Sequence, residues 1–190
     1  MKKLLIATHN PGKLREFREM LSPKGIDVVS AAEFDLPEPV EDGETFTDNA
    51  RIKAEAASQA TGLPALADDS GLCVRALQNQ PGIHSARWAG PEKDFNSAMQ
   101  RIQDGLNGRD DRTAYFVTVL VLYDPAEGVR VFEGRCDGEI VWPPRGDGGF
   151  GYDPVFQPLG HTRTFAEMSK EEKNKLSHRS KALARFLEAL

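Results

Sequence analysis

Two adjacent acidic residues follow an apolar run in the first half of the chain, and carboxylates in such a position can hold a divalent cation. Asp68 and Asp69 come directly after Ala65-Leu66-Ala67, which we interpret as the start of a strand. Adjacent carboxylates repel one another unless a cation or a donor lies close, and Mg²⁺ usually takes one or two protein carboxylates together with substrate phosphates. The pair therefore predicts a metal site at a strand end, to which the acidic loop over residues 38–44 could add a ligand. A solvated turn is the alternative, because Asp, Ser and Gly are common in turns.

A short turn near the amino end has the composition of an anion site. It lies between an apolar run over 3–7 and a segment whose apolar residues recur at helical spacing. Backbone N–H groups at a helix N-terminus attract anions, and Lys13 adds a full positive charge, so phosphate is the expected ligand. The predicted contacts are Thr8, His9, Asn10, Pro11, Gly12 and Lys13. An ordinary strand-to-helix turn is the alternative, because the segment lacks the Walker A pattern.

A glycine-rich segment near residue 150 combines conformational freedom with aromatic side chains. Four glycines occur between Gly146 and Gly151, next to two aromatic residues. Glycine lets a backbone approach a flat ligand closely, and an aromatic ring can stack on a base. These features suit a nucleoside, and the predicted contacts are Phe150, Gly151, Tyr152 and Asp153. The alternative is a loop whose aromatic residues pack into the core.

A basic cluster covers residues 170–181 of this acidic chain. Lys173, His178 and Arg179 are its candidate ligands for an anionic or polar group. At about 100° per residue, Lys173 and Arg179 would flank the apolar stripe of one straight helix, and His178 would fall on nearly the opposite side. If all three side chains contact one ligand, the helix must break or begin within this segment. The alternative is that the charges only form the solvated face of an amphipathic helix.

These candidate sites require a fold in which strands and helices alternate. The pattern predicts strands over 3–7 and 26–31 and from Ala65, with helices after Pro11 and from Phe46 until Gly62. Alternation of this kind predicts an α/β fold with a mixed sheet, in which loops at strand ends carry the chemistry.

The middle of the chain has a different character. Residues 114–123 and 129–132 predict a long β-hairpin, which we interpret as a smaller lobe. Near the carboxyl end, Ser169 and Glu172 have the spacing of a capping box before an amphipathic helix. No linker separates independent domains, so residues 1–190 are expected to form a single domain with two lobes.

Composition argues against several other classes of protein. The chain has 190 residues and a formal net charge of −5, which opposes binding to a nucleic-acid backbone because that needs a broad basic surface. No apolar run approaches the roughly 18 residues of a membrane span, and the run near Met1 is too short for a secretory signal. Cys73 and Cys136 form no C-x-x-C pair, which fits a reducing compartment. We expect a soluble, cytoplasmic protein that binds a small molecule and neither nucleic acid nor membrane.

In order along the chain, these motifs resemble those of the inosine/xanthosine triphosphate pyrophosphatase family. The turn from Thr8 to Lys13 is similar to the family's T-x-N-x-x-K, the segment 49–54 to its N-A-x-x-K-A helix, and Asp68 to Leu72 to its D-D-S-G-L. Further counterparts follow at matching spacings over nearly the whole chain, in 81–87, 149–154, 165–168, Lys173 and 177–179. Two departures are His9, where many members have Gly, and Trp88, where Tyr is frequent.

The resemblance implies an elongated mixed α/β fold with two lobes around a central cleft, usually as a homodimer. It implies Mg²⁺-dependent hydrolysis of nonstandard purine nucleoside triphosphates (XTP, ITP and dITP) to the monophosphate and pyrophosphate, which cleanses the nucleotide pool. Asp69 would accept the proton of the attacking water and bind the metal with Glu41, and whether Asp68 shares these roles stays open. The polyphosphate would contact Thr8, Asn10, Lys13, Ser70 and Lys173, with Lys53 as a helper. The base and sugar would lie against Phe150–Asp153, and His178 and Arg179 would contact the purine edge.

Base chemistry limits what this arrangement can select. Hypoxanthine and xanthine have an acceptor oxygen at the purine 6-position where adenine has an amino donor, so an arginine there disfavours ATP. GTP shares the 6-oxo group, and no residue in the sequence accounts for its exclusion. Two other functions fit the same residues: a pyrophosphatase for modified pyrimidine nucleotides, and a nucleotide sensor that binds without hydrolysis.

Overall fold

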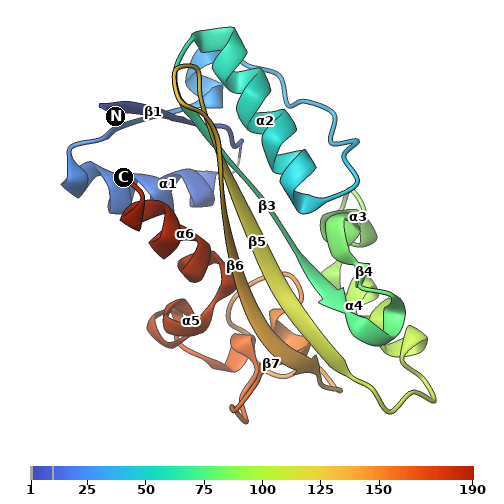
Figure 1. The fold of residues 1–190 in the computed structure, drawn as a ribbon. Helices are drawn as coiled ribbons and strands as arrows, with labels where there is room; N and C mark the ends of the chain where they lie inside the picture. The colour runs from blue at the N-terminus through green and yellow to red at the C-terminus, as the bar shows by residue number, and fades with distance from the viewer. Residues whose placement is uncertain (1, 10) are drawn as a thin grey trace. The chain divides into compact units, whose positions relative to one another are not determined.

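The computed structural model describes residues 2–9 and 11–190, and these form a seven-stranded sheet with flanking helices (Figure 1). The strands are β1 (Lys3–Ile6), β2 (Asp27–Ser30), β3 (Ala65–Val74), β4 (Gln80–Pro81), β5 (Thr113–Asp124), β6 (Gly128–Ile140) and β7 (Phe156–Pro158). Their order is β2-β1-β3-β5-β6-β7, and β4 pairs with β3. The predicted mixed α/β class is confirmed.

Helices connect most of these strands. The α-helices are α1 (Pro11–Leu21), α2 (Phe46–Thr61), α3 (Ser85–Trp88), α4 (Phe95–Gly105), α5 (Lys170–Leu176) and α6 (His178–Glu188). Short 3₁₀ helices are η1 (Ser22–Lys24), η2 (Ala31–Phe34), η3 (Arg75–Leu77), η4 (Gly82–His84), η5 (Asp153–Val155) and η6 (Phe165–Glu167). In the part of the chain that the structure describes, none of these helices has the length and apolar character that crossing a membrane requires.

The sheet is parallel around β1 and antiparallel elsewhere. β1 pairs in parallel with both β2 and β3, whereas β4 pairs with β3 and β7 with β6 in antiparallel fashion. Leu4, Leu5 and Ile6 in β1 are at most 1% exposed, as expected for a parallel strand that is covered on both faces. The chain leaves β1 at its carboxyl end and enters the turn before α1. In open α/β sheets this is the end at which ligands bind.

Contacts divide the chain into two compact units. Unit 1 comprises Met1–Asp69, Val119–Phe132 and Arg185–Leu190, and unit 2 comprises Ser70–Thr118 and Glu133–Ala184. The predicted hairpin is confirmed as β5 and β6. Its residues are divided between the two units, so the interpretation of the hairpin as a smaller lobe is wrong. A single domain with a cleft between two lobes stays a prediction.

The core of unit 1 forms where α2 packs on the sheet. This helix begins with a capping box, in which Thr45 Oγ1 accepts a hydrogen bond from Asp48 N–H and the Asp48 carboxylate accepts one from Thr45 N–H. It ends at Gly62, whose φ of +71° suits glycine. Ala57 on its buried face packs with apolar side chains of three strands, Leu5, Val29 and Ala65.

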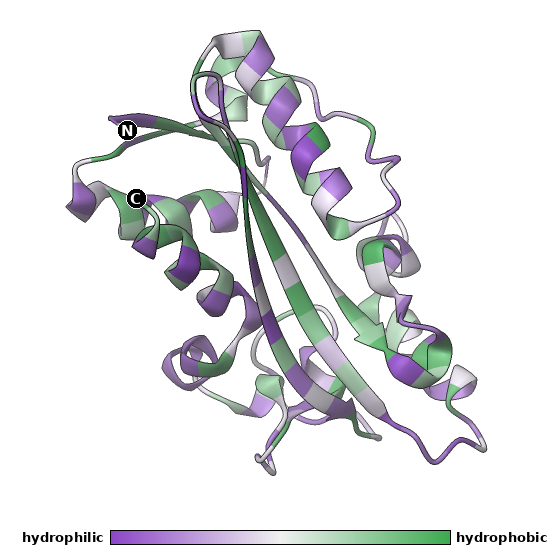
Figure 2. Cartoon of the chain, viewed as in Figure 1, coloured by the Kyte–Doolittle hydropathy of each residue, from purple (hydrophilic) through white to green (hydrophobic). Residues whose placement is uncertain are grey.

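The core of unit 2 is rich in aromatic residues. The rings of Phe116, Phe156 and Phe165 lie with centroids 4.6, 5.1 and 5.9 Å apart. In Figure 2 most of β5 has hydrophobic colouring, with paler residues in between, in line with the apolar run in the sequence. Burial of such rings stabilises the unit strongly, because each aromatic side chain removes a large apolar area from water.

The acidic pair lies inside a strand and not at its end. β3 continues through Asp68, Asp69 and Ser70 to Val74, and its residues are buried on both sides of this polar step. The expectation of a strand end, and the alternative of a solvated turn, are therefore both wrong. Leu72 and Val74 are fully buried in the core of unit 2, and this burial outweighs the local turn preference of Asp, Ser and Gly.

Candidate active site

Two lysines lie against the acidic residues of unit 1. Lys13 in α1 donates a hydrogen bond to Asp68 Oδ2 at 2.5 Å, and Lys53 in α2 lies 2.8 Å from Glu41 Oε1. The side chains of Asp68 and Lys53 are only 6% and 12% exposed. Shielding from water strengthens both attractions relative to an open surface. The structure therefore brings the predicted phosphate turn against the predicted acidic pair.

Lys53 lies in the field of several carboxylates. Burial alone would lower the pKa of its ammonium group. The pKa is instead raised above its ordinary value, because the charges of Asp68 and Asp69 together with the hydrogen bond and charge of Glu41 outweigh burial. Lys53 is thus held in its charged form between the acidic loop and the acidic pair.

Sequence reasoning gave Lys53 only a helper's role, although a signal was present. Ala50, Ala54 and Ala57 mark the buried face of α2, and Lys53 follows Ala50 by three residues and precedes Ala57 by four. A lysine on the buried face of a helix needs a partner of opposite charge. Its helical position alone therefore identifies it as a candidate for an ion pair.

The acidic loop is fixed to the start of α2 by a buried amide. The side chain of Asn49 is fully buried, and its Oδ1 accepts a hydrogen bond of 2.9 Å from the backbone N–H of Gly43. This contact lies two residues from Glu41. It holds the loop close to the helix that carries Lys53, so one element positions both members of the Glu41–Lys53 pair.

The acidic residues have the chemistry that Mg²⁺ prefers. Carboxylate oxygens are hard ligands, and Mg²⁺ usually keeps water and substrate phosphates beside one or two of them. Over residues 2–9 and 11–190, no three His, Cys, Asp or Glu side chains are grouped so that they would hold a metal ion by themselves. Asp69 and Glu41 therefore fit a metal that also binds the substrate, and do not fit a closed structural site.

The predicted phosphate turn is anchored by His9. Its Nε2 lies 2.9 Å from the carbonyl oxygen of Leu36, so the ring links the turn to the loop before α2. Thr8 is half-buried and its N–H donates to the Ile6 carbonyl, and Pro11 is the first residue of α1. Asn10, also predicted as a phosphate contact, lies outside the described residues, and the role of Gly12 stays a prediction.

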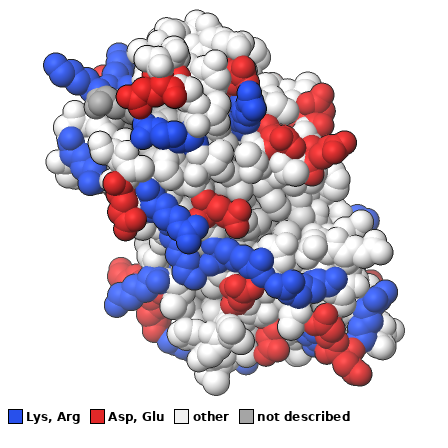
Figure 3. Space-filling model, in the orientation of Figure 1, with Lys and Arg blue, Asp and Glu red and all other residues white. Residues whose placement is uncertain are grey.

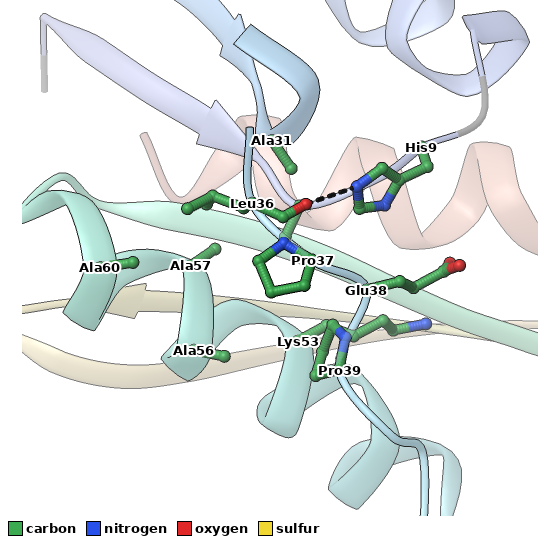
Figure 4. A pocket seen from close by; sticks show the side chains of 11 residues that line it. His9, Ala31, Leu36, Pro37, Glu38, Pro39, Lys53, Ala56, Ala57 and Ala60 are labelled. Carbon is green, nitrogen blue, oxygen red and sulfur yellow. Dashed lines mark hydrogen bonds between the residues drawn. The ribbon is translucent and has the colours of Figure 1, made fainter. Parts of the chain in front are cut away.

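A small apolar pocket opens beside this contact (Figure 4). Its volume is about 160 Å³. Alanine, leucine and proline side chains form most of its wall, and His9, Glu38 and Lys53 lie at one end of it. The pocket therefore has polar groups only where it meets the phosphate turn and the acidic loop.

In unit 2, a buried ion pair underlies the glycine-rich segment. Lys173 Nζ donates to Asp153 Oδ2 at 2.5 Å, and the same oxygen accepts a hydrogen bond of 2.8 Å from the N–H of Phe150. Lys173 Nζ also lies 4.8 Å from the centroid of the Phe150 ring, and the Arg179 guanidinium lies 5.6 Å from it. Phe150 itself is 64% exposed. The structure thus presents an open aromatic ring with two cations beside it.

The residues of the basic cluster lie on two helices. A break within this segment was expected if its side chains are to contact one ligand. α5 ends at Leu176 and α6 begins at His178, with the extended residue Ser177 between them. The capping box of Ser169 and Glu172 at the start of α5 is confirmed. The His178 ring is 8% exposed and stacks on Phe116 with centroids 4.7 Å apart.

Tyr152 belongs to the core of unit 2. It is 3% exposed, its hydroxyl donates to the Ser85 carbonyl at 2.7 Å, and its ring meets the edge of Phe95. The alternative of a core aromatic residue therefore describes Tyr152, and its stacking on a base stays a prediction, as does the contact expected of Gly151. Trp88 is likewise covered, by the Arg101 guanidinium 3.8 Å from its ring centroid.

Two residues near the predicted site did not emerge from the sequence. Thr118 is fully buried, and its hydroxyl lies 2.8 Å from that of Ser70. A threonine within the apolar run 114–123 is a usable signal, because a buried hydroxyl needs a partner. Phe116, which stacks on His178, had no such signal in a run where apolar residues are expected.

Comparison with known proteins assigns this chain to a family. The sequence model of the Ham1 family matches residues 4–189. The chain belongs to the Ham1 family. A dITP/XTP pyrophosphatase of Gluconobacter oxydans (strain 621H) is 58% identical over 185 residues, which cover 97% of this chain and 89% of that protein. A dITP/XTP pyrophosphatase of Zymomonas mobilis is 53% identical over 98% of this chain and 91% of its own length.

Solved Ham1 structures have the same fold. The Ham1 protein of Staphylococcus aureus matches with a TM-score of 0.93 and 38% identity over 99% of both chains. A HAM1 protein from Coxiella burnetii matches with a TM-score of 0.93 and 42% identity, over 100% of this chain and 98% of that one. The resemblance found from the motifs is therefore confirmed over nearly the full length.

Proposed function

We propose that this Ham1-family chain hydrolyses the nonstandard purine nucleoside triphosphates XTP, ITP and dITP to the nucleoside monophosphate and pyrophosphate. The observation that carries the proposal is the charge cluster of unit 1, in which Lys13 and Lys53 lie against Asp68 and Glu41. Relatives named dITP/XTP pyrophosphatase that are more than half identical over almost the whole chain support the same reaction.

The reaction depends on neutralising a highly charged substrate. A nucleoside triphosphate carries about four negative charges, so water attacks its α-phosphorus readily only when cations withdraw charge from the oxygens. Asp69 and Glu41 would hold Mg²⁺, which when bound lowers the charge on the phosphate oxygens. Lys13, which lies beside Asp68, and Lys53, which lies beside Glu41, would bind phosphate oxygens directly. Asp69 would accept the proton of the attacking water.

Unit 2 has the groups that suit a purine base. The exposed ring of Phe150 can stack on a base, and Arg179 beside it can donate hydrogen bonds to a 6-oxo group. Adenine would leave that guanidinium facing an amino donor, which costs binding free energy. The same contact does not distinguish GTP, whose exclusion must depend on the purine 2-position.

Three further features belong to the proposal. We expect Mg²⁺ to be required, a cytoplasmic location, and a homodimer that light scattering on purified protein would detect. The net charge of −5 favours a small substrate over nucleic acid. On the face drawn in Figure 3, basic side chains gather in a band across the middle, with acidic side chains around it.

A substrate panel tests the proposed function. Pyrophosphate release would be measured with Mg²⁺ for the triphosphates of inosine, deoxyinosine, xanthosine, guanosine and adenosine and for modified pyrimidine triphosphates. We expect kcat/KM for ITP, dITP and XTP to exceed that for ATP by about a hundredfold or more, because a charged donor that faces another donor costs about 3 kcal/mol or more. A preference for a pyrimidine would replace the proposal by its nearest competitor.

A nucleotide sensor remains the competitor from another class. The charge cluster of unit 1 would bind a triphosphate whether or not hydrolysis follows. In that case calorimetry would detect ITP binding with Mg²⁺, while no pyrophosphate would form even at high protein concentration.

A further inference from the structure

We propose that Asp153 is a positioning residue for base recognition, which holds Lys173 and the backbone of Phe150 in place and acts on the substrate only through them. This inference rests on the proposed function, because it takes Phe150 as the surface on which a purine stacks. It assigns to Asp153 a role different from the direct contact that the motif suggests.

The surroundings of the carboxylate point to this role. Asp153 is 2% exposed, and its Oδ2 receives both the N–H of Phe150 at 2.8 Å and the ammonium of Lys173 at 2.5 Å. Charge-assisted hydrogen bonds are about twice as strong as neutral ones. A carboxylate so enclosed by its own chain has little surface left for a ligand.

The sequence around Asp153 is adapted to this contact. Gly149 has a φ of +71°, and a Cβ atom there would lie 2.0 Å from Asp153 Oδ2. Any other residue at position 149 would therefore displace the carboxylate or strain the backbone. Because Gly149 has no side chain, the loop can pass close to the Asp153 carboxylate, and the Phe150 N–H can donate to Asp153 Oδ2.

The ion pair fixes what lies beside the exposed ring. Lys173 Nζ is 4.8 Å from the centroid of Phe150 and 5.3 Å from that of Phe165, and its side chain is 16% exposed. A lysine side chain without a fixed partner would sample many rotamers. Asp153 restricts it to one place, and the same oxygen fixes the backbone from which the Phe150 ring projects. Both groups would therefore be ordered before a base arrives, which lowers the entropic cost of binding.

The test compares Asp153→Asn with the wild-type protein. Asparagine keeps the shape and can still accept from the Phe150 N–H, but it loses the charge that holds Lys173. We expect KM for ITP to rise about tenfold with kcat changed less than about twofold, since a hydrogen bond to a charged group contributes about 1.5 kcal/mol or more. The Kd for inosine 5′-monophosphate should rise by the same factor, and the inhibition constant of inorganic pyrophosphate should rise less, because Lys13 and Lys53 are untouched by the substitution.

Two further variants separate positioning from general stability. Asp137→Asn removes an exposed carboxylate of unit 2 that is also paired with a cation, Arg135 at 2.6 Å, and should leave KM and Kd unchanged. If Asp153→Asn folds poorly, the double variant Asp153→Asn with Lys173→Met removes both charges of the buried pair. It should fold and still show the weakened binding of inosine 5′-monophosphate, because no ammonium group is then held beside the Phe150 ring.

The outcomes are distinct. A Kd for inosine 5′-monophosphate within about twofold of wild type in both variants would overturn the inference, as would an equal loss of pyrophosphate binding. A wild-type protein that releases no pyrophosphate from any purine triphosphate would overturn the proposed function alone, and the Kd comparison would still decide the role of Asp153.

Discussion

Asp68 and Asp69 are adjacent in the chain but have different surroundings. Successive side chains of a strand point to opposite faces, and β3 runs through both residues. Asp68 is 5% exposed and accepts a hydrogen bond from Lys13, whereas Asp69 is half-buried. Asp68 is thereby engaged in positioning Lys13, which favours Asp69 as the proton acceptor.

Replacement of Asp69 tests this division. Asp69→Asn should lower kcat for ITP by about a hundred- to ten-thousand-fold, the usual contribution of a general base, while the thermal midpoint stays close to that of the wild type. Steady-state rates and a calorimetric melt would be measured on the same preparation. Asp27→Asn is the matched control and should leave kcat unchanged. This acid belongs to the same unit and also faces a lysine, Lys3 at 3.7 Å, but its side chain is 67% exposed. Wild-type-like turnover of Asp69→Asn would remove this residue from the mechanism.

At the scale of elements, the break between α5 and α6 decides where the basic side chains lie. The sequence showed that one straight helix could not bring Lys173, His178 and Arg179 to one ligand, and it located the capping box of α5. It could not locate the break at Ser177, because no proline or glycine marks it. The start of α6 packs closely against Gly134 of β6. This is a contact between residues that are distant in the chain, which the sequence does not show.

The start of α5 gives a pH-dependent prediction. The hydrogen bond from Arg163 lowers the pKa of Glu172 from its ordinary 4.5 to about 2. A lowered folded-state pKa means that the carboxylate stabilises the fold above about pH 4.5, and that this contribution is lost as the pH falls toward 2. Glu172→Gln keeps the shape of the capping box but not the charge. It should melt below the wild type at pH 6, and the difference between the two thermal midpoints should shrink as the pH falls below about 4.5 and disappear only below about pH 2. A constant difference between pH 6 and pH 2.5 would contradict this explanation.

The docking of α6 on β6 requires a glycine. A Cβ atom at Gly134 would lie 2.0 Å from the His178 carbonyl oxygen and 2.3 Å from the Ala182 nitrogen. Because both neighbours are backbone atoms, the first turn of α6 would have to move. Gly134→Ala should therefore destabilise the protein by about 1–3 kcal/mol, as overpacking usually does, and should raise KM for ITP because His178 and Arg179 shift together.

Urea unfolding and steady-state kinetics would measure the two effects of Gly134→Ala. Gly105→Ala is the matched control, since a Cβ there meets only the flexible tip of Leu77, at 3.0 Å, and should change stability by less than about 0.5 kcal/mol. Unchanged stability in Gly134→Ala would mean that α6 is less tightly seated than the structure indicates.

For the whole molecule, the sequence predicted the kinds of element well and the contacts between them less well. Periodicity located α1, α2 and the hairpin, because burial of one face dictates the pattern, whereas α3 and α4 were not predicted. The turn-like composition of Asp68-Asp69-Ser70 gave the wrong local structure, because burial of the flanking residues extends β3. The Lys13–Asp68 and Lys173–Asp153 pairs join residues that are distant in the chain, and spacing alone cannot show such partners. The family motifs identified most of these residues without showing which of them pair.

The two cysteines test how cooperative the fold is as a whole. Cys73 and Cys136 are 2% and 4% exposed, and burial raises the pKa of both thiols. A raised pKa keeps each thiol protonated to higher pH than an exposed cysteine, and the thiolate is the reactive form. At pH 8 without denaturant, modification by a disulfide reagent should therefore be slower than in urea by about a thousandfold or more, as a stability of about 5 kcal/mol implies.

Absorbance would follow the release of the reagent's thiolate, with a small free thiol as the reference rate. Both sulfurs should react at one rate if unfolding is cooperative. A single sulfur that reacts within minutes in native buffer would instead reveal local opening of the strand that carries it, and mass spectrometry of the labelled peptides would identify β3 or β6 as that strand.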